Sequence, residues 1–483
     1  MMGRGDGIVS VTGGSGGIEA RYADIETLAR LFDDTGDGLR ATAWEDKGVL
    51  TDGDLLESAV LAPHTFAAAE AAVLQATVLP GGLAAEALDL EVDALAMQAN
   101  VVILRGVDDL QRGAVEAVDY LLGRSLGAVL PSLLLVGAAG TVLTVATNPG
   151  IAVLASLHRD RLAAVAQEEL VELLEEHPET VQHLLNGGGG LVDGLTGNLP
   201  PGVRELLLAQ LGLDPLHPTT NDIAGDLAGL FEDTGASVTE GGQDPRSLPA
   251  PTSLQEMVDN LSLTNDGASG EIDIVAIGEG DDVRYIVNLP GTDDFGTGGP
   301  EVRDTLANLQ LIGGEDTAYA RGIREAMERA GIPADAPVAL VGHSQGGMTA
   351  VHLASDPAFT DRFDVQHVVT AGAPTAQVPR LDDDIQTLSL ENVGDLVPLT
   401  DGEDNPDQPN RTTVRFDHPT GSVAGNHALE TYSAGAALVD RSGDPSLAES
   451  LAQLREDGFL VSADPDEPRP VTSTTTYTIV RQP

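Results

Sequence analysis

The first part of the chain repeats apolar residues at intervals of three and four. From Ile18 to about Leu213, segments such as IEARYADIETLARLF and RLAAVAQEELVELLEEH keep this spacing, with Gly or Pro where it breaks. An apolar stripe with a period near 3.6 residues is typical of amphipathic helices. We therefore predict an all-α N-terminal domain over residues 1–213, with slim helices packed through Leu, Ala and Val.

One segment of this predicted domain lacks charged residues. No charge occurs between Arg124 and His158, and VLPSLLLVGAAGTVLTVAT is long and apolar enough to span a bilayer. Pro131 and the turn sequence Asn-Pro-Gly at 148–150 favour two apolar helices joined by a turn instead. We predict a buried helical hairpin at 125–157, with contact with a membrane or insertion into it as the alternative.

The pattern changes after a segment rich in Pro, Gly and Asp at 214–254, which we interpret as a linker. EIDIVAIG and VRYIVNLPG predict a β-hairpin that turns at 280–282. Apolar strands then alternate with helices, which indicates a mainly parallel sheet covered on both faces. We predict an α/β domain at 255–445 and a C-terminal extension at 446–483, whose segment VTSTTTYTIVRQP could add an edge strand. Within the α/β domain the predicted helices are 305–311, 318–330, 346–355 and HALETYSAGAALVD, and the predicted strands are PVALVGH, QHVVTAGAP, IQTLSLEN and TTVRFDH.

The pattern Gly-x-Ser-x-Gly occurs twice, around Ser15 and around Ser344. Ser344 follows the apolar strand PVALVGH and opens a helix, which is the strand–turn–helix setting of a nucleophile elbow. Gly342 and Gly346 remove side chains that would collide in so sharp a turn. Ser15, in VTGGSGGIEA, is interpreted as part of a glycine turn. Glu19 stands where a dinucleotide-binding turn needs its last glycine, so no nucleotide cofactor is expected.

A serine nucleophile needs a histidine base, and the base needs a carboxylate to orient it. In a sheet of this kind the chain order is Ser, then Asp or Glu, then His. Asp395 follows the strand IQTLSLEN, and His427 in GSVAGNHALETY begins a predicted helix. We favour His427 as the base, with His418, at the end of a strand, as its competitor. The other candidate carboxylates are interpreted as solvated loop charges: Asp382, Asp383, Asp384 and Asp401.

Two backbone N–H groups are needed to hold an oxyanion. Gln345 directly follows the nucleophile candidate at a helix N-terminus, where free N–H groups and the positive end of the helix dipole suit a negative oxygen. Thr292, after Gly291 and the strand that ends at Leu289, is the second candidate, with its N–H and its hydroxyl. No metal is expected for this chemistry.

Residues from about 270 to 440 resemble an α/β-hydrolase of the class-3 lipase type. The resemblance rests on GHSQGG at the elbow, AGAP at the next strand end, ENVGDLVP at the acid loop and NHALETY at the histidine. It implies an α/β-hydrolase fold and ester hydrolysis through an acyl-enzyme. The implied roles are nucleophile for Ser344, base for His427, orienting acid for Asp395, and oxyanion donors for Gln345 and Thr292.

The chain departs from that family in two places. Leu289-Pro290 replaces the aromatic-Arg pair that usually precedes the Gly-Thr of the oxyanion loop, and no amphipathic lid is evident. These departures weaken the case for triacylglycerol and leave a small-molecule or lipid ester as the expected substrate. The alternatives are an acyltransferase or peptidase that uses the same three residues, and an interaction or exported effector protein in which the helical domain is the functional part.

Composition restricts the partners. The formal charge is -51, and Lys47 is the only lysine. So acidic a surface repels phosphate groups, which excludes nucleic acid as an expected partner. The absence of cysteine removes disulfides and thiol chemistry. The N-terminus lacks the apolar core of a signal peptide, so we expect a cytoplasmic location or export without a leader, with membrane association only through 125–157. The partner of the helical domain is not indicated.

Overall fold

The computed structural model describes residues 7–105 and 224–482, except for 78, 80–81, 103, 226–227, 230, 232, 242–245, 295 and 297–298. The chain divides into two units, residues 18–114 and residues 1–17 together with 115–483, and each unit is described by itself. The apolar segment 125–157 and the boundary predicted at 213 lie outside the described residues. Within the described ranges, no helix combines the length and the apolar character needed to cross a membrane.

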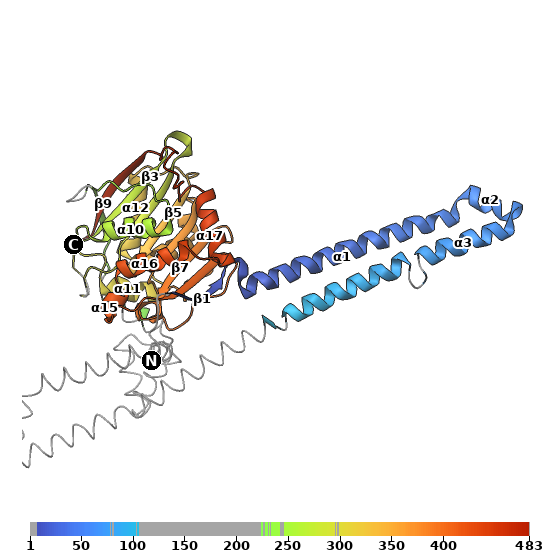
Figure 1. The fold of residues 1–483 in the computed structure, drawn as a ribbon, viewed down its shortest axis with the longest axis horizontal. Coiled ribbons are helices and arrows are strands. Elements are labelled where there is room, and N and C mark those ends of the chain that lie inside the picture. The colour runs from blue at the N-terminus through green and yellow to red at the C-terminus, as the bar shows by residue number, and fades with distance from the viewer. Residues whose placement is uncertain are drawn as a thin grey trace, which may run out of the picture. The chain divides into compact units, whose positions relative to one another are not determined.

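The described part of the helical unit is an antiparallel hairpin of helices (Figure 1). The apolar spacing predicts the helices but not their pairing. Its two arms pack through small side chains, since Ala29, Ala43, Ala87 and Ala94 are all at most 2% exposed. Arg105 closes the hairpin through ion pairs with Glu19 and Glu26, with N–O distances of 3.0 and 2.6 Å. The helices are α1 (Ile18–Gly48), α2 (Gly53–Leu61), α3 (Pro63–Thr77) and a helix at 83–102.

The second unit is built on one nine-stranded mixed sheet, with the order β1-β8-β7-β6-β5-β4-β3-β9-β2 among the described strands. The five central strands, from β8 to β4, run parallel to one another, and the outer pairings are antiparallel. The strands are β1 (Gly7–Gly13), β2 (Ala236–Glu240), β3 (Glu271–Ile277), β4 (Arg284–Leu289), β5 (Val338–His343), β6 (Val365–Ala371), β7 (Gln386–Asn392), β8 (Arg411–Asp417) and β9 (Thr472–Arg481).

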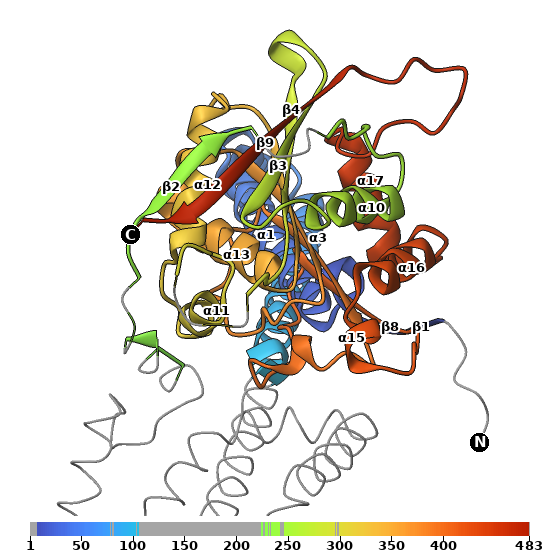
Figure 2. The ribbon, with the colours of Figure 1, turned by 90° about the vertical axis from the view of Figure 1, so that its left-hand side faces the viewer.

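Helices cover both faces of this sheet (Figure 2). Successive side chains of β5 point to opposite faces of the sheet, and both faces are apolar. Val338 and Leu340 belong to one apolar core, and Ala339 and Val341 belong to the other. α12 and α13 pack on the first face, and α10, α16 and α17 pack on the second. The helices are α10 (Leu254–Asn265), α11 (Thr305–Ile312), α12 (Ala318–Arg329), α13 (Gln345–Ser355), α14 (Pro357–Thr360), α15 (Val423–Asn426), α16 (Leu429–Asp440) and α17 (Pro445–Glu456).

Three strands differ from the sequence prediction. β2 lies inside the segment interpreted as a linker, 214–254, and pairs with β9 at one edge of the sheet. β9 is therefore not an edge strand, because it also pairs with β3 on its other side. At the opposite edge, β1 pairs with β8, so the beginning of the chain belongs to the sheet rather than to the helices. The β-hairpin of β3 and β4 and the central strands are where the apolar runs predict them.

Candidate active site

Ser344 occupies a sharp turn between β5 and α13. Its φ is 53° and its ψ is -123°, and among the described residues no other side-chain-bearing residue has a positive φ. Such a backbone conformation is costly for a residue with a Cβ and persists only where its surroundings impose it. The Ser344 N–H donates to the carbonyl of Ala371 at the end of β6, 2.9 Å away. The serine is thus fixed at the carboxyl end of the parallel strands.

Two glycines permit this turn. A Cβ on Gly342 would overlap the backbone of Gly346, and a Cβ on Gly346 would overlap the carbonyl oxygen of Leu289 at the end of β4. Neither glycine has a positive φ, so only the overlap of a Cβ with neighbouring backbone atoms restricts these positions to glycine. Both glycines lie in the turn where the sequence analysis expects them.

The other glycine-flanked serine has a different setting. Ser15 is exposed in a short turn after the edge strand β1. The neighbouring Gly16 N–H donates to the Ser446 hydroxyl, 2.9 Å away, and the Gly14 N–H donates to the carbonyl of Gln408. These bonds attach the turn to the sheet unit, so the glycines here serve a structural contact.

Asp395 and His427 meet although 32 residues separate them in the chain. The His427 Nδ1 lies 2.6 Å from the Asp395 Oδ2. The Asp395 side chain is fully buried, whereas that of His427 is 20% exposed. Asp395 follows β7 and His427 follows β8, so both lie at the same end of the sheet as Ser344. A buried carboxylate in this position fixes the ring orientation of the imidazole.

Tyr432 is a partner of the carboxylate that the sequence did not reveal. Its hydroxyl donates to the Asp395 Oδ2 at 2.6 Å and accepts the Asn392 N–H at 3.3 Å. The Val397 N–H donates to the other carboxylate oxygen at 2.9 Å. Burial, together with the nearby Asp395 charge, raises the pKa of Tyr432 well above its ordinary value. The phenol therefore remains a proton donor to Asp395.

His343, the residue before the candidate nucleophile, holds the backbone of His427. Its Nε2 lies 2.9 Å from the His427 carbonyl oxygen, and the two rings stack with centroids 4.6 Å apart. Burial, with a further contribution from His427, lowers the pKa of His343 to about 3. The ring is thus neutral at ordinary pH and donates its Nε2–H to that carbonyl.

His418, the alternative candidate for the base, forms backbone hydrogen bonds to Asn392. Its N–H donates to the Asn392 Oδ1 at 3.1 Å, and its carbonyl accepts from the Asn392 Nδ2 at 3.4 Å. The same Asn392 amide donates to the carbonyl of Asn426 at 3.0 Å. Asn392 thereby ties the acid loop to the segment that carries His427. His427, not His418, is the histidine that lies against Asp395.

The candidate oxyanion residues are joined through one amide. Asn308, on α11, donates from Nδ2 to the Thr292 hydroxyl at 3.1 Å. Its Oδ1 accepts from the Gln345 Nε2 at 2.8 Å, and the same Gln345 nitrogen donates to the Asp304 carbonyl at 2.7 Å. Sequence reasoning missed Asn308, which reads as one polar residue in an amphipathic helix. It connects the loop after β4 to the first turn of α13.

Two buried side chains brace the loop that carries Thr292. Arg303, 1% exposed, donates to the Gly291 carbonyl at 3.2 Å and pairs with Asp293. The Tyr319 hydroxyl lies 3.4 Å from the Pro290 carbonyl. A buried arginine in such a pairing fixes backbone position as well as charge. The loop is therefore held from both α12 and the segment before α11.

The sequence analysis interprets the other candidate carboxylates as solvated loop charges. This is correct for Asp383 and wrong for Asp401. Asp383 is exposed and pairs with Arg380. Asp401, however, is 2% exposed and accepts from the Ala376 N–H at 2.7 Å. Burial raises its pKa to about 7. It is a buried group of the loop after β7, and not a solvated loop charge.

A cavity of about 420 Å³ connects the candidate residues. Ser344, His427, Thr292 and Gly291 all line it, and none of the described lining residues carries a permanent charge. Its volume is within the range of small-molecule sites. In addition to these four, the lining consists of Asn265, Asn308, Ile312, His343, Met348, Pro374, Val397 and Thr400.

Comparison of the chain with protein-family models, with curated proteins and with solved structures finds no match in any of the three. Among the described residues, no group of three or more His, Asp or Glu side chains is placed to hold a metal ion.

Proposed function

We propose that the chain is a serine ester hydrolase with an α/β-hydrolase fold, and that Ser344, His427 and Asp395 form its catalytic triad. The observation that carries the proposal is the placement of the strained Ser344 on the wall of the cavity that the Asp395-bound His427 also lines. The chain order of serine, acid and histidine is the order of that fold. The four sequence motifs of the class-3 lipase type support the same assignment.

The chemistry follows from these positions. The Ser344 hydroxyl attacks the ester carbonyl carbon, while the His427 Nε2 takes its proton. The oxyanion is held by the N–H groups of Gln345 and Thr292, and Asp395 stabilises the charged imidazole. The intermediate collapses when His427 gives the proton to the alcohol oxygen, which leaves an acyl-enzyme. Water then attacks the acyl carbon while His427 takes its proton, and His427 gives that proton to the Ser344 oxygen as the bond between Ser344 and the acid breaks.

A neutral ester suits this site best. The described residues that line the cavity include no Arg, Lys, Asp or Glu. A charged headgroup in the cavity would lose water without gaining a counter-charge, and that desolvation is unfavourable. The overall charge of -51 adds long-range repulsion of anionic substrates. An uncharged carboxylic ester is therefore the proposed substrate class.

The first test is covalent labelling with a fluorophosphonate probe, which reacts with activated serines. We expect label on the wild-type protein, none on Ser344→Ala, and full label on the matched variant Ser15→Ala. In His427→Ala the labelling rate should fall by at least about a hundredfold, because the general base is lost, whereas His418→Ala should label at the wild-type rate.

The opposite result is equally informative. An unlabelled Ser344 in folded wild-type protein, over a range of salt concentrations, would contradict the proposal. The function would then have to be sought in the helical unit. Label that survives in Ser344→Ala would identify a different nucleophile.

A further inference from the structure

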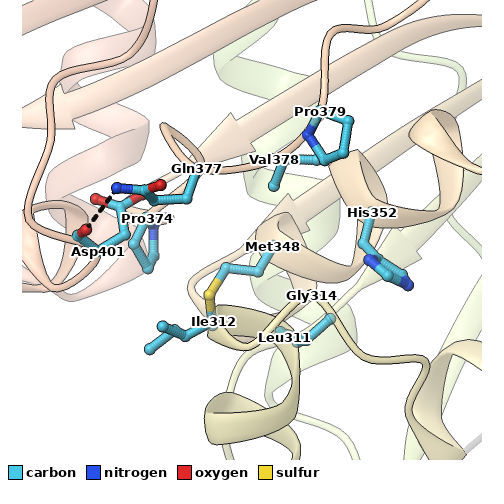
Figure 3. A pocket seen from close by; sticks show the side chains of 10 residues that line it. All are labelled: Leu311, Ile312, Gly314, Met348, His352, Pro374, Gln377, Val378, Pro379 and Asp401. Carbon is cyan, nitrogen blue, oxygen red and sulfur yellow. Dashed lines mark hydrogen bonds between the residues drawn. The ribbon is translucent and has the colours of Figure 1, made fainter. Parts of the chain in front are cut away.

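A second, smaller cavity lies next to the one that holds Ser344. Its volume is about 40 Å³, and Figure 3 shows the side chains that surround it. Ile312, Met348 and Pro374 line both cavities and therefore form the wall between them. α11, α13 and the loops after β6 and β7 contribute the remaining lining residues: Leu311, Gly314, His352, Gln377, Val378, Pro379 and Asp401.

The wall between the cavities is apolar and separate from the cores of the sheet. Leu311, Met348 and Ala373 form their own buried cluster, with Ile312 packed against it. None of these residues belongs to the two large clusters that attach helices to the sheet. An apolar lining that does not stabilise the sheet is available for an apolar ligand.

Met348 is placed to control passage between the cavities. It lies one helical turn beyond Ser344 on α13, and its N–H donates to the Ser344 carbonyl at 3.1 Å. In Figure 3 its side chain reaches toward Ile312. The unbranched thioether has three rotatable bonds, so it can change rotamer at little cost. A chain that starts at Ser344 reaches Met348 after about 6 Å, which corresponds to about five carbon atoms.

We infer that the second cavity receives the end of a hydrocarbon chain of the substrate, and that Met348 sets the chain length the site accepts. The inference rests on the proposed function, since it assumes an ester bound at Ser344. The second cavity has space for on the order of two or three methylene groups. The buried carboxyl group of Asp401 at its lining makes an anionic chain end unfavourable, so the chain that enters is uncharged.

The hydrocarbon chain can belong to either half of the ester, and two substrate series separate these cases. One series is p-nitrophenyl esters with acyl groups from acetyl to dodecanoyl, and the other is alkyl acetates from methyl to decyl. kcat/KM is measured in both series for the wild type, Met348→Ala and Met348→Phe. A response in the acyl series alone places the acid chain in the cavity, and a response in the alkyl series alone places the alcohol chain there.

We expect the wild type to prefer chains of about seven or eight carbons, about five to reach Met348 and two or three in the second cavity. Met348→Ala should favour longer chains, with the ratio of kcat/KM for decanoate to that for octanoate rising about tenfold, because each newly buried methylene contributes about fourfold. Met348→Phe should shift the preference toward shorter chains. Ile312→Ala opens the same wall from α11 and should act like Met348→Ala, which keeps the test valid if a Met348 variant does not fold.

Met327→Ala is the matched control, because Met327 lies on the buried face of α12 and lines neither cavity. It should lower thermal stability without changing chain-length preference. The inference is overturned if the Met348 and Ile312 variants change kcat/KM by the same factor at every chain length in both series. That result would leave the proposed function intact. If the wild type hydrolyses no ester and Ser344 takes no fluorophosphonate label, the proposed function fails and the inference fails with it.

Discussion

Both oxygens of the Asp395 carboxylate accept hydrogen bonds. One oxygen faces His427 and the Tyr432 hydroxyl, each at 2.6 Å, and the other accepts the Val397 N–H at 2.9 Å. Hydrogen bonds to a charged group are stronger than those between neutral groups, and a buried carboxylate is unfavourable without them. Tyr432 is therefore a positioning residue in our proposal, because it acts on the substrate only through Asp395 and His427.

The variant Tyr432→Phe tests that role. It leaves the ring and its packing in place but removes one donor from Asp395, so the carboxylate orients His427 less firmly. We expect kcat for ester hydrolysis to fall about tenfold while KM changes little. Steady-state kinetics measures both quantities.

The matched control is Tyr477→Phe, the same change at a buried position of β9 that does not line the cavity. It should leave kcat unchanged. If Tyr432→Phe has wild-type kcat, or loses kcat only in proportion to the folded fraction, Tyr432 has a purely structural role.

The sequence indicated some of these residues and not others, for physical reasons. Asp395 and His427 could be found because the order of strands places their loops at one end of the sheet. Tyr432 could not, since an aromatic residue in the apolar face of a predicted helix reads as core. Asp401 was misread, because an aspartate in a polar loop gives no sign that the loop folds over it.

At the scale of elements, the site depends on the junction of β4, β5 and α13. Gly346 allows the first turn of α13 to approach the end of β4, where a Cβ would overlap the Leu289 carbonyl. The turn that carries Ser344 and the loop that carries Thr292 therefore meet through one close backbone contact, on which the oxyanion site of our proposal depends.

The variant Gly346→Ala tests this dependence. The added methyl group must push α13 away from β4, so we expect the free energy of unfolding to fall by about 2 kcal/mol or more. Fluorophosphonate labelling of the remaining folded protein should also slow. Thermal melts and labelling rates measure the two effects.

Gly443→Ala serves as the control, because a Cβ there meets no atom within 4 Å and φ is not positive. It should match the wild type in both measurements. A Gly346→Ala protein as stable as the wild type would show that the junction tolerates a side chain.

The elements that sequence analysis missed are those without an apolar pattern. β2 reads ASVTE and has one buried residue, so nothing distinguishes it from linker. β9 is Thr-rich, and the sequence predicted a strand but not its place between β3 and β2. Pairing order is decided by which strands meet in three dimensions, and a short polar strand carries little information about its neighbours. The central strands were predictable because burial on both faces leaves continuous apolar runs.

For the molecule as a whole, stability depends on buried carboxyl groups as well as on the large surface charge. Burial raises the pKa of Glu391 to about 7 from its ordinary 4.5. Between these two pH values the folded chain binds more protons at this residue than the unfolded chain does. This contribution to stability is complete below about pH 4.5 and is lost as the pH rises to about 7.

The variant Glu391→Gln removes that dependence, since glutamine does not titrate. We expect the free energy of unfolding of the variant to rise relative to that of the wild type as the pH increases from 4.5 to 7. Above pH 7 the difference between the two proteins should be constant. Chemical denaturation at fixed salt concentration measures this difference. The repulsion among surface charges is nearly the same in both proteins and therefore largely cancels. Glu430→Gln, at an exposed position on α16, should show no such trend. A flat difference for Glu391→Gln would mean that folding leaves the pKa of Glu391 at its ordinary value.

The pairing of β1 with β8 changes how the two units can be separated. The unit of residues 18–114 follows, in chain order, a strand that belongs to the sheet. Trimming the chain from its front would therefore strip seven residues from the edge of the sheet together with the helices. It would leave β8 with an open edge that can recruit another strand and cause aggregation. In evolution, too, this unit can be exchanged without loss of β1 only as an internal segment of the chain.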